Sequence, residues 1–357
     1  MTMRYIVKCL FVLVCVLLLA SSQIFAATGK QIGTAGAMEL LIPVGARSTA
    51  LNGANIASVK GIDAMYWNPA GACVLDSRAE AMFSYQNYLA DIYVSYFAAI
   101  TDVGAIGNMG LSVKALNFGE IMETTTENPD GTGSTFSPNY LTLAAHFSRK
   151  FTDRIHFGLN AKIISERIMS TSANGFAVDL GLQYINESGL RLGFVLANFG
   201  GDMKFSGPDL EIRQQIEGTE YGSELSSMAI PTMKFGLPTQ LKIGAGYDLK
   251  IDDLNAVSLS GAFVNNASAY NTFTGGLEYA FKDMVFIRAA YSGAYMEGIE
   301  DQYEGFVLQE QNYLWGPSFG AGVKLGVGAN MSLMVDYAYQ ITAYFDNTQW
   351  FSFSFSM

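Results

Sequence analysis

The sequence predicts an all-β protein: a transmembrane outer-membrane β-barrel of about fourteen antiparallel strands, preceded by a short N-terminal plug-like segment. Half of the residues are hydrophobic and only 15% are charged, against roughly 25% in ordinary soluble domains. From Ala79 to the C-terminus, apolar and polar residues alternate with the period of a β-strand. Beyond the N-terminal leader, no apolar run is long enough to cross a bilayer as a helix. A large secreted β-sandwich is the alternative that this composition leaves open.

The N-terminus carries the features of an export signal. Arg4 and Lys8 precede an apolar core from Cys9 to Leu19, and small residues follow up to Ala27. This core is too short to span a membrane comfortably, so we expect cleavage rather than anchoring, with residues 1–26 as the signal peptide. Its removal takes away two positive charges and changes the formal charge from −11 to −13. This acidity argues against nucleic acid as a partner, because phosphates are neutralised by basic surfaces.

The rest of the chain is expected to form a plug-like segment over residues 27–78 and a barrel over 79–357. The long connections fall after odd-numbered strands, at Gly119–Pro138, Asn198–Pro238 and Ala294–Pro317, whereas the even-numbered connections are mostly tight turns. An outer-membrane barrel sorts its loops in this way, and a sandwich has no reason to do so. An even number of strands also places the N- and C-termini on the same, periplasmic side.

The two faces of the predicted strands differ in chemistry. One face is apolar and is expected to contact lipid, for example at Leu143, Ile163 and Ile243. A charge directed at lipid costs about 2–4 kcal/mol near the midplane, so the opposite face must line the lumen. That face carries both signs of charge, which favours ion pairs that brace an occupied or narrow interior, although porin constrictions also mix signs. Its members include His146, Lys162, Asp179, Lys242, Glu278, Arg288 and Asp336.

Catalysis has little support in the sequence. There is no metal-ligand spacing, phosphate-binding loop or nucleophile elbow, so we expect no enzyme activity, no metal and no cofactor. His146 and His156 are both expected to face the lumen, but they lack a third metal ligand, and hydrogen-bonded histidines are the simpler interpretation. Ser148 lies near both, although serines line the whole lumen. Cys73 is the single cysteine after the signal, and we interpret it as a small packed residue.

The third long loop is a candidate for docking a protein partner. It interleaves acidic residues with the apolar Tyr295, Met296, Tyr303, Phe306 and Leu308. Such a mixture suits the docking of a protein partner or, alternatively, the guarding of a hydrophobic pore mouth. Solvated charge is the alternative interpretation of the acids, and divalent cations that bridge carboxylates are another.

The segment before the barrel is the most specific signal. Gly45-Ala46-Arg47, Gly53-Ala54, Asp63-Ala64 and Trp67-Asn68-Pro69-Ala70-Gly71 together resemble the N-terminus of the PorV/PorQ family of outer-membrane proteins. That family is related to FadL-type transporters, which share an Asn-Pro-Ala element. The resemblance covers about Gly36 to Gly71 and departs from the family at Lys60–Asp63. It implies a type IX secretion accessory that binds the translocon or the C-terminal signal domains of cargo. The alternative is a FadL-like passage for hydrophobic small molecules.

The physical interpretation of the same segment is a plug joined to the barrel wall by a hinge. Small residues allow close backbone packing in a confined space, and Pro69 excludes Asn68 from helical geometry. Tyr66 and Trp67 are suited to bury apolar area between plug and wall. A simple capping helix is the alternative. The expected plug and hinge residues are Gly45, Arg47, Gly53, Asp63, Trp67, Asn68, Pro69 and Gly71.

Overall fold

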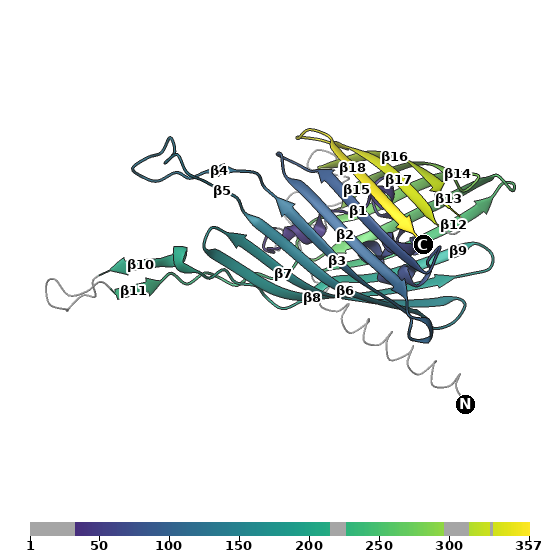
Figure 1. Ribbon diagram of the computed structural model, residues 1–357, viewed down its shortest axis with the longest axis horizontal. Coiled ribbons are helices and arrows are strands. Elements are labelled where there is room, and N and C mark those ends of the chain that lie inside the picture. The colour runs from purple at the N-terminus through teal and green to yellow at the C-terminus, as the bar shows by residue number, and fades with distance from the viewer. Residues whose placement is uncertain (1–32, 215–225, 296–313, 329–330) are drawn as a thin grey trace, which may run out of the picture.

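Fourteen strands close into one antiparallel barrel in the computed structural model, which describes residues 33–214, 226–295, 314–328 and 331–357 (Figure 1). The barrel closes where the first strand pairs with the last, with Phe83 opposite Phe353. None of the helices in the described part of the chain has the length and apolar character needed to cross a bilayer. The predicted all-β barrel is thus confirmed, and the sandwich alternative is wrong. The predicted signal peptide lies outside the described residues.

The barrel strands follow the chain in order around the wall. They are β1 (Ala79–Asn87), β2 (Tyr93–Asp102), β3 (Asn108–Asn117), β6 (Asn139–Lys150), β7 (Ile155–Ile168), β8 (Thr171–Ile185), β9 (Leu190–Gly200), β12 (Gln240–Lys250), β13 (Asn255–Asn266), β14 (Asn271–Phe281), β15 (Val285–Tyr295), β16 (Trp315–Gly326), β17 (Ser332–Thr342) and β18 (Thr348–Ser356). Each barrel strand pairs with the barrel strands that precede and follow it along the chain, so the wall has up-and-down topology.

The connections are sorted by length between the two ends of the barrel, as predicted. One end, here called the loop rim, carries the long connections. Two of them contain projecting hairpins, β4 (Ile121–Met122) with β5 (Thr135–Phe136) and β10 (Glu211–Gln214) with β11 (Ser226–Ala229), which extend away from the wall in Figure 1. The other end, the turn rim, carries short turns such as 151–154 and 186–189. Because the number of barrel strands is even, β18 ends at the turn rim, where β1 begins.

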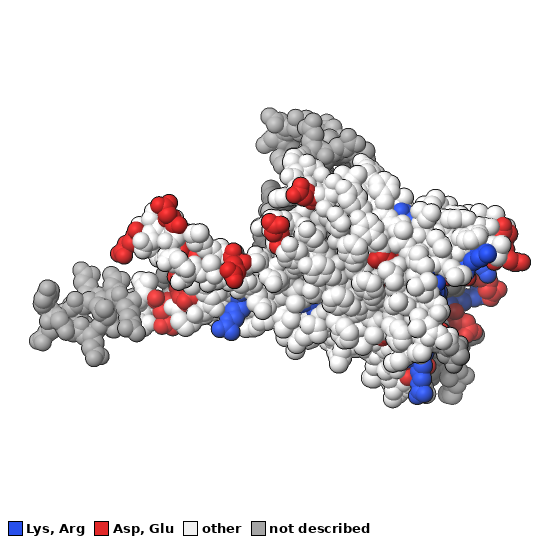
Figure 2. All heavy atoms as spheres, turned by 45° about the horizontal axis from the view of Figure 1, so that its top comes forward, with Lys and Arg blue, Asp and Glu red and all other residues white. Residues whose placement is uncertain are grey.

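The two faces of the wall have the predicted chemistry. Apolar side chains such as Ile163, which is 59% exposed, point outward, and His146, Asp179 and Arg288 are buried inside. Figure 2 shows the consequence for the surface: the visible side of the barrel wall is almost free of charge, and charged side chains gather toward the two ends. A lateral surface of this kind suits the hydrocarbon layer of a membrane.

The described residues before β1 form six short helices, which lie inside the barrel (Figure 1). Because none exceeds five residues, the segment depends on the wall rather than on its own helix propensity. Gly158 in β7 and Gly320 in β16 show how the wall admits it: a Cβ at Gly158 would overlap Pro69, and one at Gly320 would overlap Ala50. The helices are η2 (Met38–Leu41), α2 (Ala46–Thr49), η3 (Ala54–Ala57), η4 (Gly61–Asp63), α3 (Ala64–Trp67) and η5 (Pro69–Cys73).

Candidate functional site

The Asn68–Gly71 stretch is buried against the inner wall, a few residues before β1. Asn68 has φ −152° and ψ 101°, the extended geometry expected before a proline. Its side-chain Nδ2 donates hydrogen bonds to the carbonyl oxygens of Ile56, at 2.8 Å, and Leu182 of β8, at 3.4 Å. Its Oδ1 accepts one from the Ala70 amide at 3.2 Å. Asn68 therefore joins two parts of the plug to each other and to the wall.

Trp67 and Tyr66 hold the folded-back first part of the plug. The Trp67 indole Nε1 donates to the Val44 carbonyl at 2.9 Å. The Tyr66 hydroxyl donates to the carbonyl of Ile42 at 2.8 Å. The Trp67 ring lies on Gly53, which has φ +72° and has no room for a Cβ beneath the indole. Gly53 is thus required both for its left-handed backbone and for this close approach.

Arg47 ties the plug to an ion-pair network in the wall. Its Nη2 lies 3.0 Å from Glu278 Oε1 in β14. Glu278 also contacts Arg288 Nε in β15 at 2.5 Å, and Arg288 Nη1 reaches Asp336 in β17 at 2.6 Å. Charges in a low-dielectric interior need such pairing and hydrogen bonding. The mixed lumen charges that were predicted to brace the interior therefore include these connected ion pairs of Arg47, Glu278, Arg288 and Asp336.

Asp63 is buried near this network. A Cβ at Gly45, whose φ is +76°, would lie 2.7 Å from Asp63 Oδ1, an oxygen that has no hydrogen-bond partner in the described part of the chain. Burial raises the pKa of Asp63 to about 7, although the charge of Arg47 acts in the opposite direction. Asp63 thus has a carboxyl group that titrates close to neutrality.

A second polar network ties the plug to β6, β7 and β8. Asn160 Nδ2 donates to the Met65 carbonyl at 2.7 Å and to Asp179 at 3.0 Å. Lys162 Nζ forms an ion pair with Asp179 at 2.6 Å. His146 Nδ1 lies 2.6 Å from Asn160 Oδ1, the hydrogen-bonded arrangement expected for a lumen histidine. Over the described ranges, no group of three His, Cys, Asp or Glu side chains has the geometry of a metal site.

Two cavities lie on opposite sides of the plug. One, of about 400 Å³, opens toward the loop rim, and Thr49, Asn52 and Trp67 belong to its lining. The other, of about 460 Å³, opens toward the turn rim, and Arg47, Leu51 and Asn55 belong to its lining. The two share no lining residue. The plug therefore separates two vestibules within the described structure.

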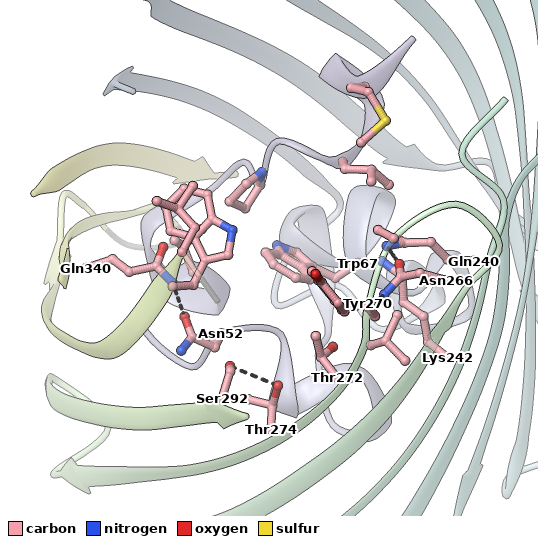
Figure 3. Close-up of a pocket in the computed structure, with 18 of the residues that line it drawn as sticks. Asn52, Trp67, Gln240, Lys242, Asn266, Tyr270, Thr272, Thr274, Ser292 and Gln340 are labelled. Atoms are coloured by element: carbon pink, nitrogen blue, oxygen red, sulfur yellow. Dashed lines mark hydrogen bonds between the residues drawn. The ribbon is translucent and has the colours of Figure 1, made fainter. Parts of the chain in front are cut away.

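The loop-rim cavity combines aromatic rings, amides, hydroxyls and one cation (Figure 3). Lys242, Asn266 and Gln240 lie beside Trp67 on one side, while Asn52 and Gln340 lie opposite. The Lys242 ammonium lies 5.8 Å from the centre of the Trp67 ring, within cation–π range. The sequence predicted that Lys242 faces the lumen, but it did not single out this cavity. The alternation of apolar and polar residues shows that a side chain points into the lumen. It does not show which plug residue that side chain contacts.

The predicted docking loop lies mostly outside the described residues. Tyr295 ends β15 at the loop rim, whereas Met296, Tyr303, Phe306 and Leu308 fall in the range 296–313, which is not described. Other connections at this rim are visible. In Figure 2 the projecting hairpins carry several acidic side chains. On β10–β11, the cross-strand pair Ile212 and Met228 is exposed.

Comparisons with known proteins agree on the kind of protein. The family model for the type IX secretion system protein PorV matches residues 25–267. Among solved structures, the CymD monoaromatic hydrocarbon channel is 13% identical, with 88% of this chain and 97% of that chain covered and a TM-score of 0.53. A FadL homologue from Pseudomonas aeruginosa is also 13% identical, with 88% and 98% covered and a TM-score of 0.52. At this identity the two structures show a shared fold. A search of curated proteins gives no match.

Proposed function

The chain belongs to the family of the type IX secretion system protein PorV, and from this we propose that it is an accessory protein of type IX secretion. It is an outer-membrane β-barrel. In the proposed role it binds the translocon, or the C-terminal signal domains of exported cargo, and helps deliver cargo to the cell surface. The family match carries this proposal. The role is one of binding, without catalysis and without a cofactor.

The plug that lies across the lumen supports a binding role. The plug is hydrogen-bonded to the wall through Asn68 and paired with it through Arg47. Wall glycines leave space that the plug occupies, as at Gly158 and Gly320. For a polypeptide, folded or unfolded, to pass through the barrel, the plug would have to leave the lumen. A partner would therefore engage the rims or the outer wall.

The loop rim is the proposed contact surface. We place it outside the cell, with the turn rim and both termini in the periplasm, because outer-membrane barrels have short periplasmic turns and longer extracellular loops. The exposed Ile212 and Met228 on a projecting hairpin are apolar groups that a partner could cover. Tyr295 leads from the same rim into the predicted docking loop.

A deletion strain tests the proposal. Loss of the gene should leave several cargo proteins in the periplasm, and the wild-type gene should restore their export. A complementing gene that lacks residues 296–313 should insert its barrel in the outer membrane but fail to restore export. An unchanged set of secreted proteins in the deletion strain would contradict the secretion role.

A passage for hydrophobic small molecules is the second candidate. The loop-rim cavity beside Tyr66 and Trp67 favours it, because a transporter of this kind requires an internal site of this size. The test is uptake of a radiolabelled hydrophobic compound by vesicles that contain the purified protein. Uptake equal to that of protein-free vesicles would exclude this candidate.

A further inference from the structure

We propose that the loop-rim cavity binds the free C-terminal carboxylate of an extended polypeptide, with the Lys242 ammonium as its charge partner. The inference rests on the proposed secretion role, because it names the part of a cargo chain that the barrel recognises. It assigns a site to residues that form no part of the plug's own attachment to the wall.

Charge is the first argument. Lys242 is 9% exposed, and it has no salt bridge among the residues that the structure describes. The other two buried lysines of the lumen are satisfied: Lys162 pairs with Asp179, and Lys114 donates to the Glu39 carbonyl at 2.7 Å. No aspartate or glutamate lines the described loop-rim cavity. A buried ammonium of this kind favours an incoming anion.

The surroundings of Lys242 select among anions. Four amide side chains line the cavity in two hydrogen-bonded pairs: Asn52 with Gln340 at 2.7 Å, and Gln240 with Asn266 at 2.5 Å. Asn52 also donates to the Gly316 carbonyl at 3.4 Å, and Asn266 also donates to the Tyr270 carbonyl. Each of the four amides still retains donor or acceptor capacity beyond these bonds. Thr272, Thr274 and Ser292 add hydroxyl groups. Peptide N–H and C=O groups match the remaining donors and acceptors of this lining, whereas a hydrocarbon chain would leave those remaining groups without partners.

Aromatic rings complete the fit. Trp67 forms part of the cavity beneath Lys242, and Tyr270 and Trp315 contribute further lining. Rings of this kind bury apolar side chains and stack against peptide groups. A volume of about 400 Å³ exceeds the needs of a small inorganic anion and suits the last few residues of a chain.

The turn-rim cavity offers a contrast that argues for the assignment. Most of its cations are already paired, for example Arg191 with Asp248 at 2.5 Å and Lys324 with Asp76 at 2.6 Å, and the exposed Lys250 is the exception among its described lining residues. An anion that entered it would compete with these carboxylates. The described lining of the loop-rim cavity contains no carboxylate, and the nearby charge of Asp179, which acts on Lys242 from outside the cavity, is itself paired with Lys162.

Calorimetry on the purified full-length barrel in detergent micelles tests the site. The probes are an acetylated pentapeptide that ends in valine, as the free acid, and the same peptide with a C-terminal amide. The free acid should bind, and the amide should bind roughly ten- to hundredfold more weakly, the effect of one charge-assisted hydrogen bond. Lys242→Gln should weaken binding of the free acid by a similar factor. Lys242→Arg, which keeps the positive charge, should retain most of the wild-type affinity. Lys250→Gln, an exposed change on the same strand, is the matched control.

Two results would overturn the proposal. Equal binding of the acid and the amide would show that the carboxylate is not recognised. If hexanoate binds as tightly as the peptide, the amide side chains of the cavity do not recognise a polypeptide. The ligand would then be a small organic acid. A second variant, Asn266→Asp, places a competing carboxylate in the cavity and should also weaken the free acid. Retained heat-modifiable migration in gels checks that each variant is folded.

Export assays separate this site from the secretion role itself. If the deletion strain loses export but Lys242→Gln restores it fully, the secretion role stands and the carboxylate site is contradicted. If the deletion strain exports normally, the secretion role fails, whatever the peptide binding shows. If Lys242→Gln loses both peptide binding and export while Lys250→Gln keeps both, the result supports the secretion role and the carboxylate site together.

Discussion

Arg47 of the plug and Glu278 of β14, 231 residues apart in the chain, form a two-pronged contact with Nε at 3.2 Å and Nη2 at 3.0 Å from the two carboxylate oxygens. This contact is a charge link between plug and wall, and Arg288 continues it to Asp336. The link combines two functions. It neutralises an acid inside the barrel, and it fixes the position of helix α2.

Arg47→Ala should loosen the plug. Removing one partner of a buried pair costs about 3–5 kcal/mol, but the Arg47 side chain is 22% exposed, so we expect about 1–3 kcal/mol. Urea unfolding followed by gel mobility measures the change, and limited proteolysis should cut the plug sooner. Arg154→Ala is the control, because the pair of Arg154 with Glu187 is exposed and should contribute little to stability. Equal effects from the two changes would contradict the role of Arg47.

Gly158→Ala should displace the plug from β7. The new methyl group would overlap the carbonyl group of Pro69, which is backbone and has little freedom to move. Overpacking of this kind costs about 1–3 kcal/mol. Gly275→Ala in β14 is the matched control, since no atom lies within 4 Å of its Cβ position. Unfolding midpoints measure both variants, and a Gly158→Ala protein as stable as the control would show that the plug does not need this contact.

Asp63 should make stability depend on pH. Burial raises its pKa to about 7, above the ordinary value of 3.8. Between these values the folded protein holds a proton that the unfolded chain has released, so stability falls as pH rises through this window. The slope from one group is at most about 1.4 kcal/mol per pH unit. Unfolding in urea at pH 5 and pH 8 measures it, and Asp63→Asn should remove this component. A wild-type difference that persists in the variant would assign it to other groups.

The barrel could be predicted because its signals are local. Alternation along a strand such as β7 and the length of a loop are properties of neighbouring residues, and the confirmed loop parity follows from them. The cavity could not be predicted in the same way. The contact of Asn52 with Gln340 joins residues 288 apart, and it depends on the path of the plug inside the wall. Inward alternation gave the direction of Lys242 but not its neighbours.

Trp67 is the residue whose change should affect plug packing and the cavity together. Trp67→Ala removes the ring that lies on Gly53 and the Nε1 donor to Val44, and the loss of a large aromatic typically costs about 3–5 kcal/mol. Trp67→Phe keeps much of the ring and leaves only the Val44 carbonyl without its donor, so we expect about 1–3 kcal/mol.

The same pair of variants distinguishes packing from a barrier role. If Trp67 also separates the vestibules, Trp67→Ala should raise single-channel conductance in planar bilayers, while Trp67→Phe should stay near the wild-type value. Trp315→Ala is the control, because Trp315 lines the loop-rim cavity from the wall and belongs to β16 rather than to the plug. An increase with Trp315→Ala as large as that with Trp67→Ala would assign the barrier to the rim of the barrel. An increase with Trp67→Ala alone would place the barrier at the plug, where the indole donates to the Val44 carbonyl and lies on Gly53.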